Sequence, residues 1–509
     1  MKVTSKYEKD PHKDLAAHTG HVKKIAVFLA VLCVAGCQER LDPKDPKDPT
    51  DPTAPTEQES TTLDGRLVEI LSTQYSDPDS LMSAPFSPDT PVLNTLKELL
   101  APLYLKSVQE RKVQLDRVFQ SRVGLTPDGH RQWRVESHYF TYRTQSARGE
   151  DIVLSGRVIF PNNTVEGVPH SVKALILESH QAGDAGITSE TQRELKSLLA
   201  LSDAAIILPD FQGYGTTLGQ ETYCFVSSEV LARQLADCTL AALDVMSQRD
   251  VTLAPYGYTL NQGESQGAVV PIAFARWYET KAPQSFKDQI RLRATLSALG
   301  PQDFAAMTWY LSDHQENNAI LVARIAVSLP ALSEQMLEGY AATDFYSDAV
   351  KNTMVESMPY YEAAGKHEYN IFGTEKDAPK LEKLAEILAP DMLTENGRLD
   401  AQSPKTQAFM RILAQQNPLT DWTPSLPIYF VSCPQDDAIT HEISHDTYRT
   451  LSAYGSNPSV HWGNLQLPPL SAAILSKIPL ATHIVPTFIL RLRLNTSDYY
   501  KDLVSDWEN

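Results

Sequence analysis

One serine lies in a pattern that could make it a nucleophile. Ser265 is the centre of Gly263-Glu264-Ser265-Gln266-Gly267, which has the form G-x-S-x-G. A serine hydroxyl is a weak nucleophile at neutral pH and needs a base that takes its proton during attack. The two glycines would let the backbone reverse tightly between a strand and a helix. The backbone N–H of Gln266, at the start of that helix, could then bind a developing oxyanion. The pattern predicts covalent catalysis by Ser265.

An acidic residue that could assist Ser265 follows the apolar run 428–432. Asp436 lies in the sequence Asp436-Asp437-Ala438-Ile439, directly after that run. A catalytic carboxylate must orient the histidine base and stabilise its imidazolium form. We expect Asp436 to have this role, and Asp437 is the alternative.

The base should be a histidine on a late loop, after one further strand that we expect at 459–465. His483 follows this segment and precedes the apolar stretch 486–492. It would take the Ser265 proton and return it to the leaving group. The rival candidates are His461, which lies on the expected strand itself, and the pair His441 and His445.

A second motif points to different chemistry. His441-Glu442-Ile443-Ser444-His445 has the form H-E-x-x-H, in which two histidines on one helix face bind zinc and the glutamate acts as a base. No G-x-x-H continuation follows. No glutamate occurs between Glu442 and Glu508, so His461 would have to be the third ligand. We therefore expect no metal and no cofactor, and consider a zinc protease the weaker hypothesis.

The segments around Ser265 alternate between apolar runs and helical periodicity, which predicts a mainly parallel sheet covered by helices on both faces. The expected strands are 172–177, 204–208, 256–260, 291–298 and 426–432, and the expected helices are 189–201, 228–247 and 268–280. Pro271 falls inside the helix after Ser265, where it would remove a hydrogen bond.

The segments before this region read differently. Residues 61–125 show helical periodicity, whereas 133–142 and 151–161 alternate and predict two antiparallel strands.

Between the strand after Ser265 and the strand before Asp436, the strand rhythm stops. Residues 301–420 predict helices, among them 319–329, 378–388 and 404–415. An insertion at this place could be a cap that shapes substrate access, or a helical subdomain without a gating role. Three apolar residues near its start could line an entrance or simply pack in a core; they are Met307, Trp309 and Tyr310.

Together these motifs resemble the α/β-hydrolase superfamily, and within it the bacterial and fungal secretory lipases and esterases. Ser179-His180-Gln181 resembles the His-Gly element of that group, with Gln181 in place of glycine. Asp210-Phe211-Gln212-Gly213-Tyr214-Gly215 resembles its D-x-x-G-x-G loop, which is not catalytic. The likeness covers about 130–300 and 420–490.

The resemblance implies an α/β-hydrolase fold and a Ser265-Asp436-His483 triad acting through an acyl-enzyme. The backbone N–H groups of Gln266 and Gln181 would bind the oxyanion, although His180 could also be purely structural. The expected substrate is a small-molecule or lipid ester. A peptidase or amidase with the same triad, or an inactive binding protein with this fold, remains an alternative.

The N-terminal segment predicts export. Lys23-Lys24 precede the apolar run 25–34, which is typical of a signal peptide. Val34-Ala35-Gly36-Cys37 resembles the lipobox of bacterial lipoproteins, which implies lipid attachment at Cys37 and a location on the cell envelope. An ordinary signal peptide or a short anchor helix is the alternative. The Asp-Pro repeat at 42–53 predicts an extended tether.

We therefore expect five parts along the chain. They are a signal peptide (1–36), a tether (37–60), a helical segment (61–129), a hydrolase core (130–300 and 421–509) and a helical insertion (301–420).

The net charge of the 509-residue chain is −18, which argues against nucleic acid or anionic lipid as a main partner. Of the five cysteines, Cys33 would leave with the signal peptide and Cys37 would carry lipid. Cys224 and Cys238 could form a disulfide in an exported protein, which would leave Cys433 as a buried thiol. The sequence does not indicate an oligomeric state.

Overall fold

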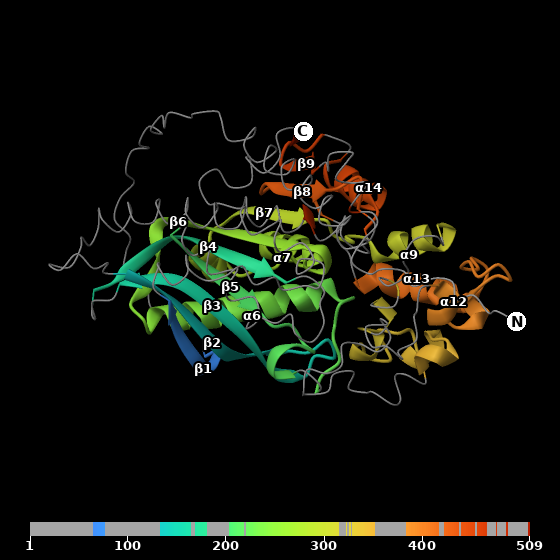
Figure 1. Ribbon diagram of the computed structural model, residues 1–509, viewed down its shortest axis with the longest axis horizontal. Helices are drawn as coiled ribbons and strands as arrows, with labels where there is room; N and C mark the ends of the chain where they lie inside the picture. Colours follow the sequence, from blue (N-terminus) through green and yellow to red (C-terminus); the bar gives the residue numbers. More distant parts are fainter. Residues whose placement is uncertain are drawn as a thin grey trace, which may run out of the picture.

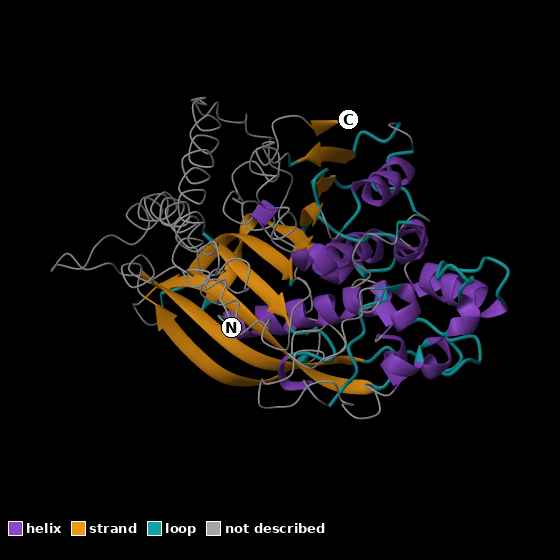
Figure 2. Ribbon diagram, turned by 45° about the vertical axis from the view of Figure 1, so that its right-hand side comes forward, coloured by secondary structure: helices purple, strands orange, loops and turns teal. Residues whose placement is uncertain are grey.

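A mixed sheet of ten described strands forms the centre of the chain, in the order β1-β2-β3-β5-β4-β6-β7-β8-β9-β10. Figure 2 shows the strands as one twisted layer. The strands are β1 (Leu67–Ser76), β2 (Trp133–Gln145), β3 (Asp151–Asn163), β4 (His170–Ser179), β5 (Ala204–Pro209), β6 (Val251–Glu264), β7 (Leu292–Ala298), β8 (Ile428–Ser432), β9 (Val460–Asn464) and β10 (Trp507–Glu508).

The computed structural model describes a little over half of the chain. The described residues are 65–76, 133–163, 168–180, 203–217, 220–314, 322, 325–326, 328–351, 383–416, 422–436, 439–453, 456–465, 475, 485–486 and 507–508. The signal peptide, the tether and the lipidation site expected from the sequence lie outside them. Within the described ranges, no helix combines the length and the apolar character needed to cross a bilayer.

The central strands run parallel, as their continuous apolar sequences predict. Parallel pairing joins β5, β4, β6, β7, β8 and β9 in sheet order, whereas β1, β2, β3 and β10 pair antiparallel. Strands β5 and β8 are buried along their whole length. The predicted α/β class is therefore confirmed.

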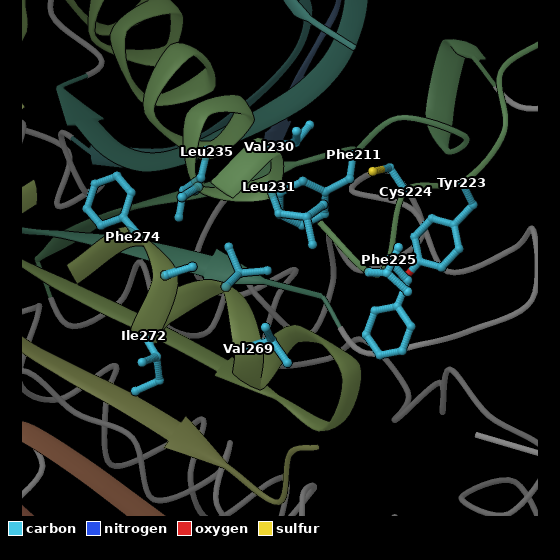
Figure 3. Close-up of a cluster of buried hydrophobic side chains, with 14 of the residues drawn as sticks. Phe211, Tyr223, Cys224, Phe225, Val230, Leu231, Leu235, Val269, Ile272 and Phe274 are labelled. Carbon is cyan, nitrogen blue, oxygen red and sulfur yellow. The ribbon is translucent and has the colours of Figure 1, made fainter. Parts of the chain in front are cut away.

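Helices α6 (Ser228–Ser247) and α7 (Val269–Thr280) pack against each other and against the sheet (Figure 1). Both match the helices expected from the sequence, apart from the first turn before α7. Figure 3 shows their apolar residues facing one another, with Leu231 and Leu235 on one side and Val269 and Phe274 on the other. Helix α8 (Gln284–Ile290) follows α7, and α14 (His441–Leu451) packs on β8 and β9.

The part of the insertion that is described contains helices and two isolated β-bridges. Figure 1 shows α9, α12 and α13 beyond the carboxyl ends of the parallel strands. The elements are α9 (Phe304–Asp313), α12 (Leu384–Ile387), α13 (Pro404–Gln416) and the 3₁₀ turns η3 (Leu329–Ala331), η4 (Ala342–Phe345) and η6 (Pro390–Met392). They share the buried core cluster of the sheet and its helices.

Two sequence predictions are wrong in the described residues. Residues 67–76, expected to be helical, form β1, because pairing with β2 satisfies the backbone groups of both strands. The rest of the helical segment lies outside the described part. Cys224 and Cys238 form no disulfide and are buried free thiols. Burial raises the pKa of Cys224 to about 12, and Cys238 Sγ packs against Gly156.

A buried carboxylate joins the strands that lie away from the parallel centre. The Glu136 side chain is fully buried on β2 and accepts hydrogen bonds from four residues, which are His138, Arg134, Arg249 and Asn162. Burial alone would raise the pKa of Glu136, but the hydrogen bonds from His138, Arg249 and Arg134 outweigh it and lower the pKa from 4.5 to about 2.

We predict that this carboxylate makes stability fall in acid. Because its folded-state pKa is depressed, Glu136 contributes stability that is present above about pH 4.5 and is lost as the pH falls towards about 2. Glu136→Gln should lower the free energy of unfolding by about 3 kcal/mol at pH 7 and by much less at pH 3. Urea unfolding at both pH values measures this. Glu69→Gln, on the exposed part of β1, is the control and should cost little at either pH.

Candidate functional site

Ser265 occupies a sharp turn at the carboxyl end of β6. The chain passes from β6 into the 3₁₀ turn η2 (Ser265–Ala268) and then into α7. Ser265 has φ of +54°, in the left-handed region that costs a non-glycine residue about 1–2 kcal/mol. Its neighbours Glu264 and Gln266 are buried, whereas Ser265 is only partly buried. The turn thus holds a strained serine at the edge of the sheet.

Three glycines allow the backbone to pass this closely. A Cβ on Gly263 would lie 2.2 Å from the Gly267 carbonyl oxygen, and a Cβ on Gly267 would lie 2.4 Å from the Ser179 carbonyl oxygen. A Cβ on Gly300, which follows β7, would lie 2.1 Å from the Ala268 Cβ. No side chain fits at these separations. Gly300 was not predicted from the sequence, although a glycine just after the strand beside β6 was a usable signal.

Pro271 does not disturb the helix after the turn. It is the third residue of α7, and the first four N–H groups of an α-helix have no partner within the helix. Its missing N–H therefore removes no hydrogen bond from α7. The Asn261 side chain donates a hydrogen bond of 2.9 Å to the Pro271 carbonyl oxygen, so α7 is also tied to β6.

Asp436 lies on the loop that leaves β8. Strands β6, β7 and β8 are parallel neighbours, so this loop and the Ser265 turn emerge at the same edge of the sheet. One carboxylate oxygen of Asp436 accepts a 2.9 Å hydrogen bond from the Ile439 N–H, and the Asp436 N–H donates to the Cys433 carbonyl. The side chain is partly buried. This loop geometry fixes the direction of the Asp436 carboxylate.

The structure does not place three of the residues expected at the site. His483, Gln181 and Asp437 lie outside the described residues. Strand β9 ends at Asn464, opposite Ser432 at the end of β8, so the chain that leads to His483 departs from this same edge.

The rival histidines are divided between two faces of the sheet. The rings of His441 and His445 stack with centroids 6.0 Å apart, and both contact the Trp462 ring. His461 stacks instead on Tyr429, and it faces away from Trp462 because successive residues of β9 point to opposite faces. His461 therefore cannot join the other two as a zinc ligand. The described ranges contain no group of three acidic, histidine or cysteine residues able to hold a metal.

The loop after β5 is held in place by β3 and by its own close packing. The Asp210 carboxylate accepts a 2.7 Å hydrogen bond from Ser155 Oγ. Gly215, at φ of +54°, packs so closely that a Cβ there would lie 2.4 Å from Asp210 Oδ2. His180, which directly follows β4, is buried, and its ring contacts the rings of Phe211 and Tyr214. Asp210 thus stabilises a loop that in turn supports His180.

Buried polar groups surround the base of the turn. Glu178, at the end of β4, accepts a hydrogen bond from Gln262 of β6, and both side chains are buried.

Of the apolar residues at the start of the insertion, Met307 is fully buried, whereas Trp309 and Tyr310 are partly buried against the same core. Core packing therefore accounts for Met307.

The fold is similar to that of solved structures at low sequence identity. One is a ligand-bound form of the rice cell wall degrading esterase LipA from Xanthomonas oryzae, with a TM-score of 0.56 and 16% identity over 84% of this chain and 97% of that chain. Another is a Legionella pneumophila protein provisionally assigned as a hydrolase, with a TM-score of 0.51 and 14% identity over 84% of this chain and all of the other. No protein-family model and no curated protein matches the sequence.

The strain at Ser265 should affect the stability of variants at this position. Ser265→Gly should be more stable than Ser265→Ala by about 0.5–1 kcal/mol, because glycine relieves the left-handed strain and this exceeds its greater freedom in the unfolded chain. Chemical unfolding of the two variants measures the difference. At Ser171, in the extended strand β4, the order should reverse. Equal stabilities of the two Ser265 variants would contradict the strain.

Proposed function

We propose that this chain, which has an α/β-hydrolase fold, is a serine hydrolase that cleaves carboxylic esters through an acyl-enzyme intermediate. The observation that carries the proposal is the conformation of Ser265. A left-handed serine between β6 and α7, with glycines at 263, 267 and 300 where the backbone is crowded, is the geometry that exposes a nucleophile above a sheet. Strain of this kind persists where the surrounding structure enforces it, and it is concentrated at functional sites.

In the proposed mechanism, Ser265 Oγ attacks the carbonyl carbon of the ester while His483 takes the hydroxyl proton. Asp436, whose carboxylate direction is fixed by Ile439 N–H, would hold the imidazole and stabilise its charged form. The Gln266 N–H, and an N–H from Gln181, would bind the oxyanion. The alcohol leaves with the proton from His483, and water then releases the acyl group by the same steps in reverse.

Ester cleavage is favoured over the other reactions of such a triad for two reasons. The alkoxide leaving group of an ester needs less protonation than an amine, so ester cleavage is the less demanding reaction of this machinery. LipA, which this fold resembles, is an esterase that degrades rice cell wall. The acyl and alcohol groups would be selected by the insertion beyond the strand ends (Figure 1).

Removal of the nucleophile tests the proposal directly. Ser265→Ala should lower the hydrolysis of p-nitrophenyl esters about a thousand-fold or more and abolish labelling by a fluorophosphonate probe. Ser171→Ala, near the amino end of β4 and away from the Ser265 turn, is the matched control and should keep both. Folding of each variant is checked by circular dichroism. Wild-type protein that is neither labelled nor active on esters with short to long acyl chains would refute the proposal.

We also propose that the protein is exported and anchored to a membrane of the bacterial cell envelope by lipid on Cys37, which follows Val34-Ala35-Gly36. Cys37→Ala should abolish incorporation of labelled fatty acid and leave the precursor uncleaved. Cys33→Ala, four residues earlier in the apolar run, is the control and should be processed as in the wild type. Fatty acid incorporated into Cys37→Ala protein would contradict the proposal. Intact mass and detergent partition measure both outcomes.

A further inference from the structure

The end of β4 lies directly against the Ser265 turn. A Cβ on Gly267 would lie 2.4 Å from the Ser179 carbonyl oxygen and 2.5 Å from the His180 carbonyl oxygen. Backbone at this separation has no freedom to shift without moving the turn. Contacts that hold His180 in place therefore also hold the backbone that packs against the Ser265 turn.

A series of aromatic rings holds His180 from the far side. The His180 ring meets Tyr214 edge-on with centroids 4.6 Å apart, and Tyr214 meets Tyr223 edge-on at 4.8 Å. Tyr223 stacks on Phe225 at 5.9 Å, and Figure 3 shows these two rings side by side. All are buried. Each such pair adds to stability beyond the area it buries, because the ring edge and face carry opposite partial charges.

The series ends on the insertion. Phe225 meets Phe304 edge-on with centroids 4.7 Å apart, and Phe304 is the first residue of α9 and fully buried. Asp303 caps α9 by accepting a 2.8 Å hydrogen bond from the Ala306 N–H, so the place where Phe304 enters the core is fixed. An unbroken line of ring contacts therefore joins the start of the insertion to His180.

A second connection runs from the same place to the turn itself. The Gln302 side chain donates a 2.8 Å hydrogen bond to Ser297 Oγ, and Ser297 Oγ donates one of 2.8 Å to the Ala268 carbonyl in η2. Both side chains are buried, which makes each hydrogen bond costly to break. Gly300, two residues before Gln302, packs on Ala268.

We infer that residues 300–304, where β7 leads into the insertion, position two backbone segments of the active site. These segments are the Ser265 turn and the end of β4 at His180. Residues 300–304 are called the root of the insertion. In this inference Phe304, Tyr223 and Tyr214 are positioning residues that act through His180, and Gln302 acts through Ser297 on the turn. It rests on the proposed function for its effect on catalysis. The rings transmit the position of the insertion to the β4 segment, from which the second oxyanion donor is expected. A disturbance at the root should thus lower kcat more than it raises KM, because it misplaces groups needed in the transition state.

The test compares ring removal inside and outside the series. Phe304→Leu and Tyr223→Leu should each lower kcat for p-nitrophenyl acetate about ten-fold with KM changed less than two-fold. Tyr223→Phe keeps the ring and should restore kcat. Phe345→Leu is the matched control, because Phe345 is equally buried in the insertion and its ring contacts are with Tyr340 and Phe409. It should keep wild-type kcat.

Hydrogen exchange separates this inference from the proposed function. The peptide that contains His180 should exchange faster in Phe304→Leu and Tyr223→Leu than in the wild type, and should be unchanged in Phe345→Leu and Tyr223→Phe. Hydrogen exchange can be measured without catalysis. An inactive wild-type protein would therefore refute the proposed function, and the exchange rates would still test whether the rings position His180. A Phe345→Leu variant that matched Phe304→Leu in kcat and in exchange would overturn the inference.

Discussion

Three backbone segments approach one another closely around Ser265, and this crowding limits which residues the site can contain. The turn, the end of β4 and the segment that follows β7 lie so near one another that a single methyl group at Gly263, Gly267 or Gly300 would overlap neighbouring atoms. At the centre of this close packing, Ser265 has the left-handed φ of +54°. The sheet holds this strained conformation in place, because β4 and β7 pair with β6 as far as the residues just before Ser265.

The parallel centre of the sheet also explains why distant residues can cooperate. Ser265 and Asp436 are separated by the whole insertion, yet the loops that carry them leave the same edge. The insertion is itself part of the site's support. Its first residues contact the turn through Gln302 and Ser297, and contact the β4 segment through a line of aromatic rings. The insertion is thus attached where the backbone around Ser265 is least able to move.

Several sequence inferences followed from local physics and agree with the structure. The apolar runs of β4, β5, β7 and β8 and the helical period of α6 are strong signals, because burial on both faces or on one stripe leaves a clear pattern. Where the pattern was short, it misled. The run at 67–76 fits either period, and its pairing with β2 decided for a strand. The Cys224–Cys238 pairing was inferred from the expected export and from the few cysteines that remained, and both residues are instead buried free thiols.

Residue types and their spacing were enough to predict the α/β fold class, Ser265 as the residue at the turn, and the order in which the acid and base candidates follow it. These depend on residue types at short spacings and on hydrophobic period. The three-dimensional fold is what strains Ser265, places Gly300 against the turn and makes His461 face away from His441 and His445. It also joins Phe304, at the root of the insertion, to His180 through four successive ring contacts. Such relations depend on which segments meet in space, and sequence spacing does not encode the packing that brings them together.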